Sequence, residues 1–205
     1  MKRIRGRFAP SPTGEMHLGN AWTALLSWLY IKSQGGEMVL RVEDLDPDRS
    51  RCEYTALLLD DMKWLGLDWD EGPDCGGPYD PYCQSGRSEL YDRALQRLRE
   101  GGHLYHCYCT RAELHTVTVA PHTGEREFVY SGICRTLSKE AQEIRSRTRR
   151  PALRLAVPEQ TIRFRDGLQG EMAQSLRTAC GDFVVRRADG VHAYQLAVVV
   201  DDGLM

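Results

Sequence analysis

Apolar and polar stretches alternate over the first forty residues in a way that predicts a strand, a helix and a second strand. Residues 4–9 predict a short strand, which two prolines, Pro10 and Pro12, stop. Over 20–32 the apolar side chains recur at helical spacing, and the glycine pair at 35–36 ends that helix. Residues 38–42 then predict a second strand, so we expect a right-handed βαβ unit with parallel strands.

Later segments predict more helices and strands around loops rich in glycine and proline. Helical spacing runs through Leu57 to Leu65 and again over 88–100, with a loop at 70–82 between them. The remaining predicted strands lie at 152–157, 161–165, 183–186 and 193–200, the last two joined by a hairpin turn at 188–190. This alternation of strands and helices predicts an α/β fold.

Polar residues gather where three of the predicted strands end, after Ala9, Val42 and Val200. Ligands bind at the carboxyl ends of strands in open parallel sheets, although loop starts are polar in any protein. The first cluster also leads into a helix N-terminus, whose free N–H groups attract phosphate. His17 there can donate to a phosphate, and Gly19 lets a purine or ribose approach the backbone. These features predict a nucleotide site at the sheet edge.

Composition restricts the partners and the compartment. The 205 residues carry 27 basic and 29 acidic side chains, so any nucleic acid must be held by a local patch such as 145–150 or 186–187. The longest aliphatic run, 196–200, is too short to span a bilayer, and no apolar signal segment is expected at the N-terminus. The seven cysteines favour free thiols or metal ligands over disulfides. We therefore expect a cytoplasmic protein.

Three of these cysteines form a candidate metal site. Cys107 and Cys109 are separated by one residue, and Cys134 follows, so an extended turn can present their thiolates to one Zn²⁺. The alternative is three unpaired thiols. Candidate histidines for the fourth ligand are His103, His106, His115 and His122. The acidic residues Asp44, Asp46 and Asp48 are interpreted as turn and cap residues rather than a magnesium site.

Several motifs resemble the class I aminoacyl-tRNA synthetases that activate glutamate. Residues 7–14 (RFAPSPTG) and 17–20 (HLGN) are similar to the signature of that family, with HLGN at the place of its HIGH sequence. The resemblance continues through segments 41–47, 64–72, 82–87, 107–111 and 182–190. One departure is Trp22, where relatives usually have arginine. The resemblance implies a Rossmann-like parallel sheet with a small zinc-binding insertion.

The same resemblance implies a domain organisation. Residues 1–104 would form the first part of the nucleotide-binding domain, 105–175 the zinc-binding, acceptor-type insertion, and 176–205 the return to the sheet. The second ATP-binding segment of the family would lie beyond Met205. We therefore expect a C-terminally truncated catalytic domain that turns over ATP weakly or not at all by itself.

Functional residues are implied by position within the matching motifs. Arg7 would pair with a glutamate carboxylate, and Ser11 and Glu43 would receive the ammonium group. The implied glutamate-binding residues are Arg7, Phe8, Ala9, Pro10, Ser11, Glu43 and Tyr194. The implied catalytic residues are His17, Gly19 and Asn20. The implied zinc ligands are Cys107, Cys109, Tyr130 and Cys134.

The implied reaction is activation of glutamate by ATP with Mg²⁺. The acidic turn at 43–47 and the segment 193–202 resemble the shorter branch of the family, which transfers glutamate to queuosine in the anticodon loop of tRNA(Asp). One alternative is the catalytic part of an enzyme that charges tRNA(Glu). Another is a non-catalytic, zinc-stabilised RNA-binding fragment. A monomer is expected in each case.

Overall fold

The computed structural model describes residues 3–110, 113 and 129–205. The chain divides into two compact units, Met1–Tyr91 with Ala197–Met205, and Asp92–Leu196. The division falls within the sequences of helices α3 (Ser88–Glu100) and α7 (Tyr194–Leu204). None of the helices in the described ranges is long and apolar enough to cross a membrane.

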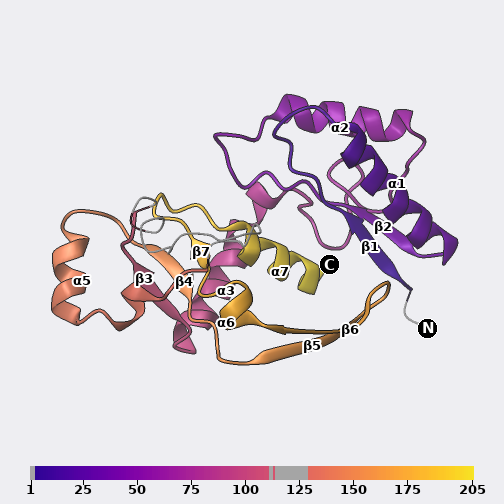
Figure 1. Cartoon of the computed structure of the whole chain (residues 1–205). Helices are drawn as coiled ribbons and strands as arrows, with labels where there is room; N and C mark the ends of the chain where they lie inside the picture. The colour runs from indigo at the N-terminus through magenta and orange to yellow at the C-terminus, as the bar shows by residue number, and fades with distance from the viewer. Residues whose placement is uncertain (1–2, 111–112, 114–128) are drawn as a thin grey trace. The chain divides into compact units, whose positions relative to one another are not determined.

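The first unit is built on a βαβ motif (Figure 1). Strand β1 (Arg5–Phe8), helix α1 (Leu18–Ser33) and strand β2 (Glu37–Leu40) follow one another, and β1 pairs in parallel with β2 from Arg5 and Glu37 to Phe8 and Leu40. The prediction from the apolar pattern is therefore confirmed. Gly35 follows α1 with φ of +62°, a left-handed conformation that suits glycine at a helix end.

Two later segments extend this sheet beyond β2. Val39 forms an isolated parallel bridge with Glu71, and Val42 forms another with Cys83. In sequence, helix α2 (Cys52–Trp64) lies between β2 and Glu71, and the 3₁₀ helix η1 (Gln84–Arg87) follows Cys83. The apolar core of the unit consists of Phe8, Ala24, Ile31, Met38, Leu40, Leu58, Met62 and Leu67. Truncating a fully buried member such as Leu40 to alanine would cost roughly 2–5 kcal/mol.

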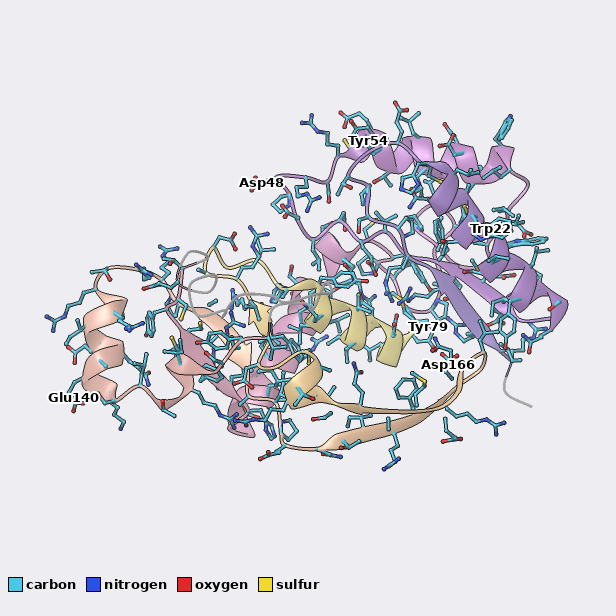
Figure 2. All side chains as sticks on the ribbon, in the orientation of Figure 1. Trp22, Asp48, Tyr54, Tyr79, Glu140 and Asp166 are labelled. Atoms are coloured by element: carbon cyan, nitrogen blue, oxygen red, sulfur yellow. The ribbon has the colours of Figure 1, made fainter. Side chains whose placement is uncertain are left out.

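Helix α1 buries less of its apolar surface than its sequence predicts. Ala24 and Ile31 are in the core, and Trp28 packs partly against it. Trp22, the residue that departs from the family pattern, is 59% exposed on α1 (Figure 2). Its indole therefore contributes to the surface of α1 rather than to the core.

The second unit contains two antiparallel sheets. Strands β3 (Leu104–Cys107), β4 (Ala152–Leu155) and β7 (Val184–Arg186) form one sheet in the order β3-β4-β7. Strands β5 (Thr161–Asp166) and β6 (Gly170–Ser175) form a separate hairpin around the turn at 167–169. The helical elements of this unit also include η2 (Ile133–Thr136), α5 (Lys139–Ser146) and α6 (Leu176–Ala179).

The predicted strand at 193–200 is wrong, because these residues belong to helix α7. A short uninterrupted apolar run has no alternation, so its periodicity cannot separate a strand from a buried helix. The burial pattern is helical: Ala193, Leu196, Ala197 and Asp201 are the buried positions. The predicted turn before it is present, and it closes on a single antiparallel bridge between Arg186 and His192.

Candidate active site

The carboxyl ends of β1 and β2 lie side by side, which brings two of the predicted polar clusters together. The amide of Arg41 donates to the Phe8 carbonyl at 3.1 Å, and the amide of Glu43 donates to the Pro10 carbonyl at 2.9 Å. Parallel pairing thus continues past the ends of both strands. The segment that follows β1 and the acidic turn that follows β2 consequently form one edge of the first unit.

Four charged side chains form a chain of ion pairs at this edge. Asp202 of α7 accepts from Arg7 Nε at 2.6 Å and from Arg7 Nη2 at 2.9 Å, so the pairing is bidentate. The Asp202 Oδ1 atom also accepts from Arg41 Nη1 at 2.8 Å. Arg41 Nη2 donates in turn to Glu43 Oε1 at 3.0 Å. The predicted residues Arg7 and Glu43 are therefore connected through Arg41 and Asp202.

Burial gives this chain of ion pairs its electrostatic character. Arg41 has no exposed surface, Glu43 is 6% exposed, and Arg7 remains exposed. Burial raises the pKa of Glu43, although the hydrogen bond from Arg41 opposes that shift. Burial also acts to raise the pKa of Asp202, but hydrogen bonds from Arg7 and Arg41 outweigh it and the pKa falls below its ordinary value. Glu43 thus sits in a desolvated place beside a permanent cation.

Asp201 anchors the end of α7 in the first unit. It is fully buried, and its carboxylate accepts from Arg87 Nε at 2.7 Å, Gln84 Nε2 at 2.8 Å and Tyr91 Oη at 2.9 Å. The three donors come from η1 and α3. Sequence reasoning did not assign a role to any of them, although the segment 82–87 was among the motifs that carry the family resemblance.

A cavity of about 200 Å³ lies along β1 and β2 in the same unit. Its walls include the side chains of Arg5, Arg7 and Arg41, and Asp202 is its one acidic lining residue. The Arg5 guanidinium forms a bidentate pair with Glu71, with Nη1–Oε1 and Nη2–Oε2 distances of 2.6 and 2.9 Å. Three guanidinium groups around a small cavity suit an anionic ligand.

The N-terminus of α1, where the sequence predicts a phosphate site, is closed by a capping box. His17 is its N-cap, and His17 Nδ1 accepts from the Gly19 amide at 3.1 Å. The proton of a neutral imidazole is then on Nε2, which leaves that atom as a donor. Asn20 completes a capping box by accepting from the His17 amide at 3.2 Å. A Cβ at position 19 would lie 2.9 Å from the imidazole, so any other residue there would push His17 out of its cap position.

The other predicted glutamate-binding residues occupy different environments. The Phe8 side chain is in the core and Pro10 is buried, so neither side chain is exposed to a ligand. Ala9 is half-buried and Ser11 is exposed. Tyr194 begins α7 within the second unit and is 57% exposed. The structure therefore brings together Arg7 and Glu43, whereas Tyr194 belongs to the other unit.

The acidic residues after Glu43 serve the turn. Asp44 accepts from the Ser85 amide at 2.8 Å and from the Ser85 hydroxyl at 2.6 Å. Asp46 accepts from the amide of Asp48, which Figure 2 shows on the loop before α2, at 3.2 Å. The Asp46 contact agrees with its interpretation as a turn residue. Asp44 instead ties the turn to η1, 41 positions away.

The cysteines predicted to bind metal converge in the second unit. The Sγ atoms of Cys107, Cys109 and Cys134 all lie within 4.8 Å of one another. The Tyr130 hydroxyl lies 3.5 Å from Cys107 Sγ and 3.6 Å from Cys109 Sγ. Strand β3, the turn after it and η2 supply the three thiols.

This donor set fits a tetrahedral Zn²⁺. Zn–S bonds of about 2.3 Å place sulfurs roughly 3.8 Å apart in a tetrahedron, and Cys109 Sγ and Cys134 Sγ are 3.4 Å apart. Tyr130 supplies the nearest oxygen for the fourth position. His103 and His106 are not part of the cluster among the described residues, and the rival ligands His115 and His122 lie outside the described residues. The cluster could therefore hold a metal ion.

Comparison with known proteins gives the class to which this fold and site belong. Residues 3–205 match the family described as tRNA synthetases class I (E and Q), catalytic domain. The chain belongs to this family.

Three relatives show how similar the chain is to individual members of the family. The chain is 53% identical over 200 residues to Glutamyl-Q tRNA(Asp) synthetase of Nitratidesulfovibrio vulgaris, covering 97% of this chain and 62% of that protein. It is 46% identical over 204 residues to Glutamate–tRNA ligase of Symbiobacterium thermophilum, covering 98% of this chain and 42% of that protein. A glutamate tRNA ligase from Elizabethkingia meningosepticum, solved in complex with its amino acid, has a TM-score of 0.81 at 30% identity, covering 98% of this chain and 42% of that one. The chain thus spans less than two thirds of each relative.

Proposed function

We propose that this chain carries the glutamate-activating part of an enzyme that transfers glutamate to queuosine in tRNA(Asp). The observation that carries the proposal is the buried Arg41–Glu43 pair beside exposed Arg7 at the carboxyl edge of the parallel sheet. Glutamate has two carboxylates and one ammonium group, and this edge offers cationic and anionic partners within one connected network. The higher identity to Glutamyl-Q tRNA(Asp) synthetases than to Glutamate–tRNA ligases supports the choice of acceptor.

The substrate contacts follow from the charges. Arg7 binds the side-chain carboxylate of glutamate through its planar fork, for which Asp202 is the present partner. Glu43 receives the ammonium group with Ser11, and Arg41 holds the Glu43 carboxylate in place. Because Asp202 already accepts from Arg7, the incoming carboxylate must share that guanidinium or displace Asp202.

The chemical step requires alignment rather than a protein nucleophile. An oxygen of the substrate α-carboxylate attacks the α-phosphorus of ATP, the bond to the bridging oxygen breaks, and pyrophosphate leaves with that electron pair. His17 Nε2–H and the positive end of the α1 dipole stabilise the charge that develops on the phosphates. ATP brings Mg²⁺ on its own phosphates. A hydroxyl oxygen of queuosine then attacks the carbonyl carbon of the glutamyl-adenylate: an ester bond forms, the bond to the phosphate oxygen breaks, AMP leaves with that electron pair, and the hydroxyl proton is released.

The thiol cluster has a structural role in this proposal. Cys107, Cys109, Tyr130 and Cys134 would hold one Zn²⁺ in the second unit, because all four donors already converge. A closed tetrahedral site of this kind stabilises a small fold and leaves no open coordination position for catalysis.

The acceptor test uses the chain extended to the length of its relatives, with labelled glutamate, ATP and three RNAs: tRNA(Asp) with queuosine, tRNA(Asp) without it, and tRNA(Glu). We expect label on the queuosine-containing tRNA(Asp) alone. Label on tRNA(Glu) would instead assign the chain to the Glutamate–tRNA ligases. Isothermal titration with glutamate and with ATP checks the site separately from transfer. Binding of RNA with no binding of either small molecule would contradict glutamate activation and support the non-catalytic RNA-binding alternative.

A further inference from the structure

One face of the β3-β4-β7 sheet carries a basic row that the proposed activation chemistry does not use. His106 pairs directly with Leu153, and Leu153 pairs directly with Arg186, so these residues form one row across the three strands. Directly paired residues project to the same face of a sheet. Leu153 is 7% exposed, so an apolar floor lies between two basic side chains.

Other basic side chains surround this row. A cavity of about 300 Å³ is lined by His106 and by four arginines, Arg99, Arg150, Arg186 and Arg187. Arg99 comes from the last turn of α3, and Arg150 stands just before β4. Asp189 is the one acidic residue in the lining. Neither Arg99 nor Arg150 makes an ion pair within the described part of the chain, and both are exposed. The cavity therefore offers guanidinium groups to an incoming anion.

The turn after β7 holds the rim of this cavity in a fixed shape. The Arg187 amide donates to the Val191 carbonyl at 2.8 Å, and the Gly190 amide donates to the Arg187 carbonyl at 3.0 Å. Arg186 Nε donates to the Gly190 carbonyl at 3.0 Å, and Arg187 Nη2 pairs with Asp189 Oδ2 at 2.6 Å. The turn thus holds Arg186 and Arg187 in place. Binding a ligand therefore costs little side-chain conformational entropy at these two residues.

The charge of the second unit points to the kind of anion. This unit holds 17 basic side chains against 12 acidic ones, and 16 of the 17 are arginines. Arginine binds phosphate oxygens through its planar fork, and an apolar floor accommodates a sugar or a base edge. We propose that the cavity binds a backbone phosphate of the RNA substrate; the choice of RNA over another phosphate compound rests on the proposed function.

The test measures binding of the complete chain to a fluorescent RNA stem-loop over a series of potassium chloride concentrations. The variant R99Q/R150Q removes two exposed guanidiniums from the cavity. We expect its affinity to fall about tenfold, with a salt dependence that is shallower by about one to two in log–log slope. The matched control is R163Q/R177Q, which removes two exposed arginines of the same unit, from β5 and α6, outside the cavity. It should lose no more than about threefold.

Three outcomes would overturn the proposal. Equal losses in the two double variants would show a general electrostatic field rather than a site. If the wild-type chain does not bind the stem-loop, RNA is not the ligand of the cavity. Inorganic phosphate that binds the wild type, binds R99Q/R150Q more weakly and does not compete with RNA would assign the cavity to a free anion. Glutamate binding is measured on the same preparations. If RNA binding depends on the cavity but glutamate does not bind, the proposed function is contradicted and this site is not. If glutamate binds but RNA binding does not depend on the cavity, this site is contradicted and the proposed function is not.

Discussion

The two units use charged side chains in opposite ways. The first unit has 10 basic and 17 acidic residues, and it buries several of them: Arg41, Glu43, Glu71, Arg87 and Asp201. The second has an excess of arginine and, among its described residues, buries only Arg154 and Asp182 of its Asp, Glu, Lys and Arg side chains, whereas Arg99 and Arg150 of its basic cavity are exposed. Charge is therefore more often buried and paired in the first unit and more often exposed in the second.

This difference changes what holds each unit together. A buried ion pair stabilises only while both partners and their remaining hydrogen bonds are satisfied. The first unit meets that condition through the connected network of Arg7, Asp202, Arg41 and Glu43. The second unit has a thiol cluster whose packed members are Cys107, Tyr108, Tyr130 and Cys134. Each unit can consequently be disrupted by a different change.

Metal removal should have the largest effect, and the effect should be confined to the second unit. We expect the purified, reduced chain to contain one Zn²⁺, and chelation or Cys134→Ser to cost on the order of 5 kcal/mol or more in the free energy of unfolding of that unit. The measurement is metal analysis followed by amide hydrogen exchange, which reports on the two units separately. Cys180→Ser is the matched control, because Cys180 lies outside the thiol cluster. Chain without zinc that remains fully protected would contradict the site.

Removing the buried carboxylate of Asp201 should have the next largest effect, in the first unit. Asp201→Ala leaves Arg87, Gln84 and Tyr91 without their acceptor in a dry interior. We expect a loss of about 3–5 kcal/mol in the free energy of unfolding, measured by urea denaturation. Asp60→Asn, on the exposed side of α2, should stay within about 0.5 kcal/mol. A loss below about 1 kcal/mol for Asp201→Ala would show that the network does not anchor α7.

Local sequence patterns predicted the strands and the first helix of the first unit, but they did not predict the hydrogen bonds around Asp201. The periodicity of 4–42 predicts β1, α1 and β2, because strand, helix and strand each have their own spacing. The role of Asp201 has no such signal, since its donors lie 110 or more positions away in the chain. The uninterrupted apolar run at 196–200 therefore predicted neither helix α7 nor the contacts of Asp201, which follows that run.

Replacing Glu43 should affect glutamate binding more than ATP binding. Glu43→Gln keeps the shape of the side chain but removes the counter-charge for the substrate ammonium group, so we expect glutamate affinity to fall roughly 10- to 100-fold. ATP affinity should change less than about threefold, because its phosphates are assigned to the α1 N-terminus. Isothermal titration measures both. Glu37→Gln, a carboxylate at the opposite end of β2, is the matched control. Equal losses for the two ligands would contradict the assigned role.

The smallest effect is the pH dependence of stability that Glu43 and Asp202 impose with opposite signs. Burial raises the pKa of Glu43 despite the Arg41 hydrogen bond, so the folded chain takes up a proton before the unfolded chain does. As the pH falls through that raised pKa, the free energy of unfolding of the wild type should rise relative to Glu43→Gln. The pKa of Asp202 is lowered, because hydrogen bonds from Arg7 and Arg41 outweigh its burial. Its contribution is present above its ordinary pKa and disappears as the pH falls through the lowered one. The wild type should therefore lose its advantage over Asp202→Asn in that lower range. Urea denaturation between pH 7 and pH 3 separates the two, and parallel curves for all three proteins would show that neither carboxylate belongs to a desolvated network.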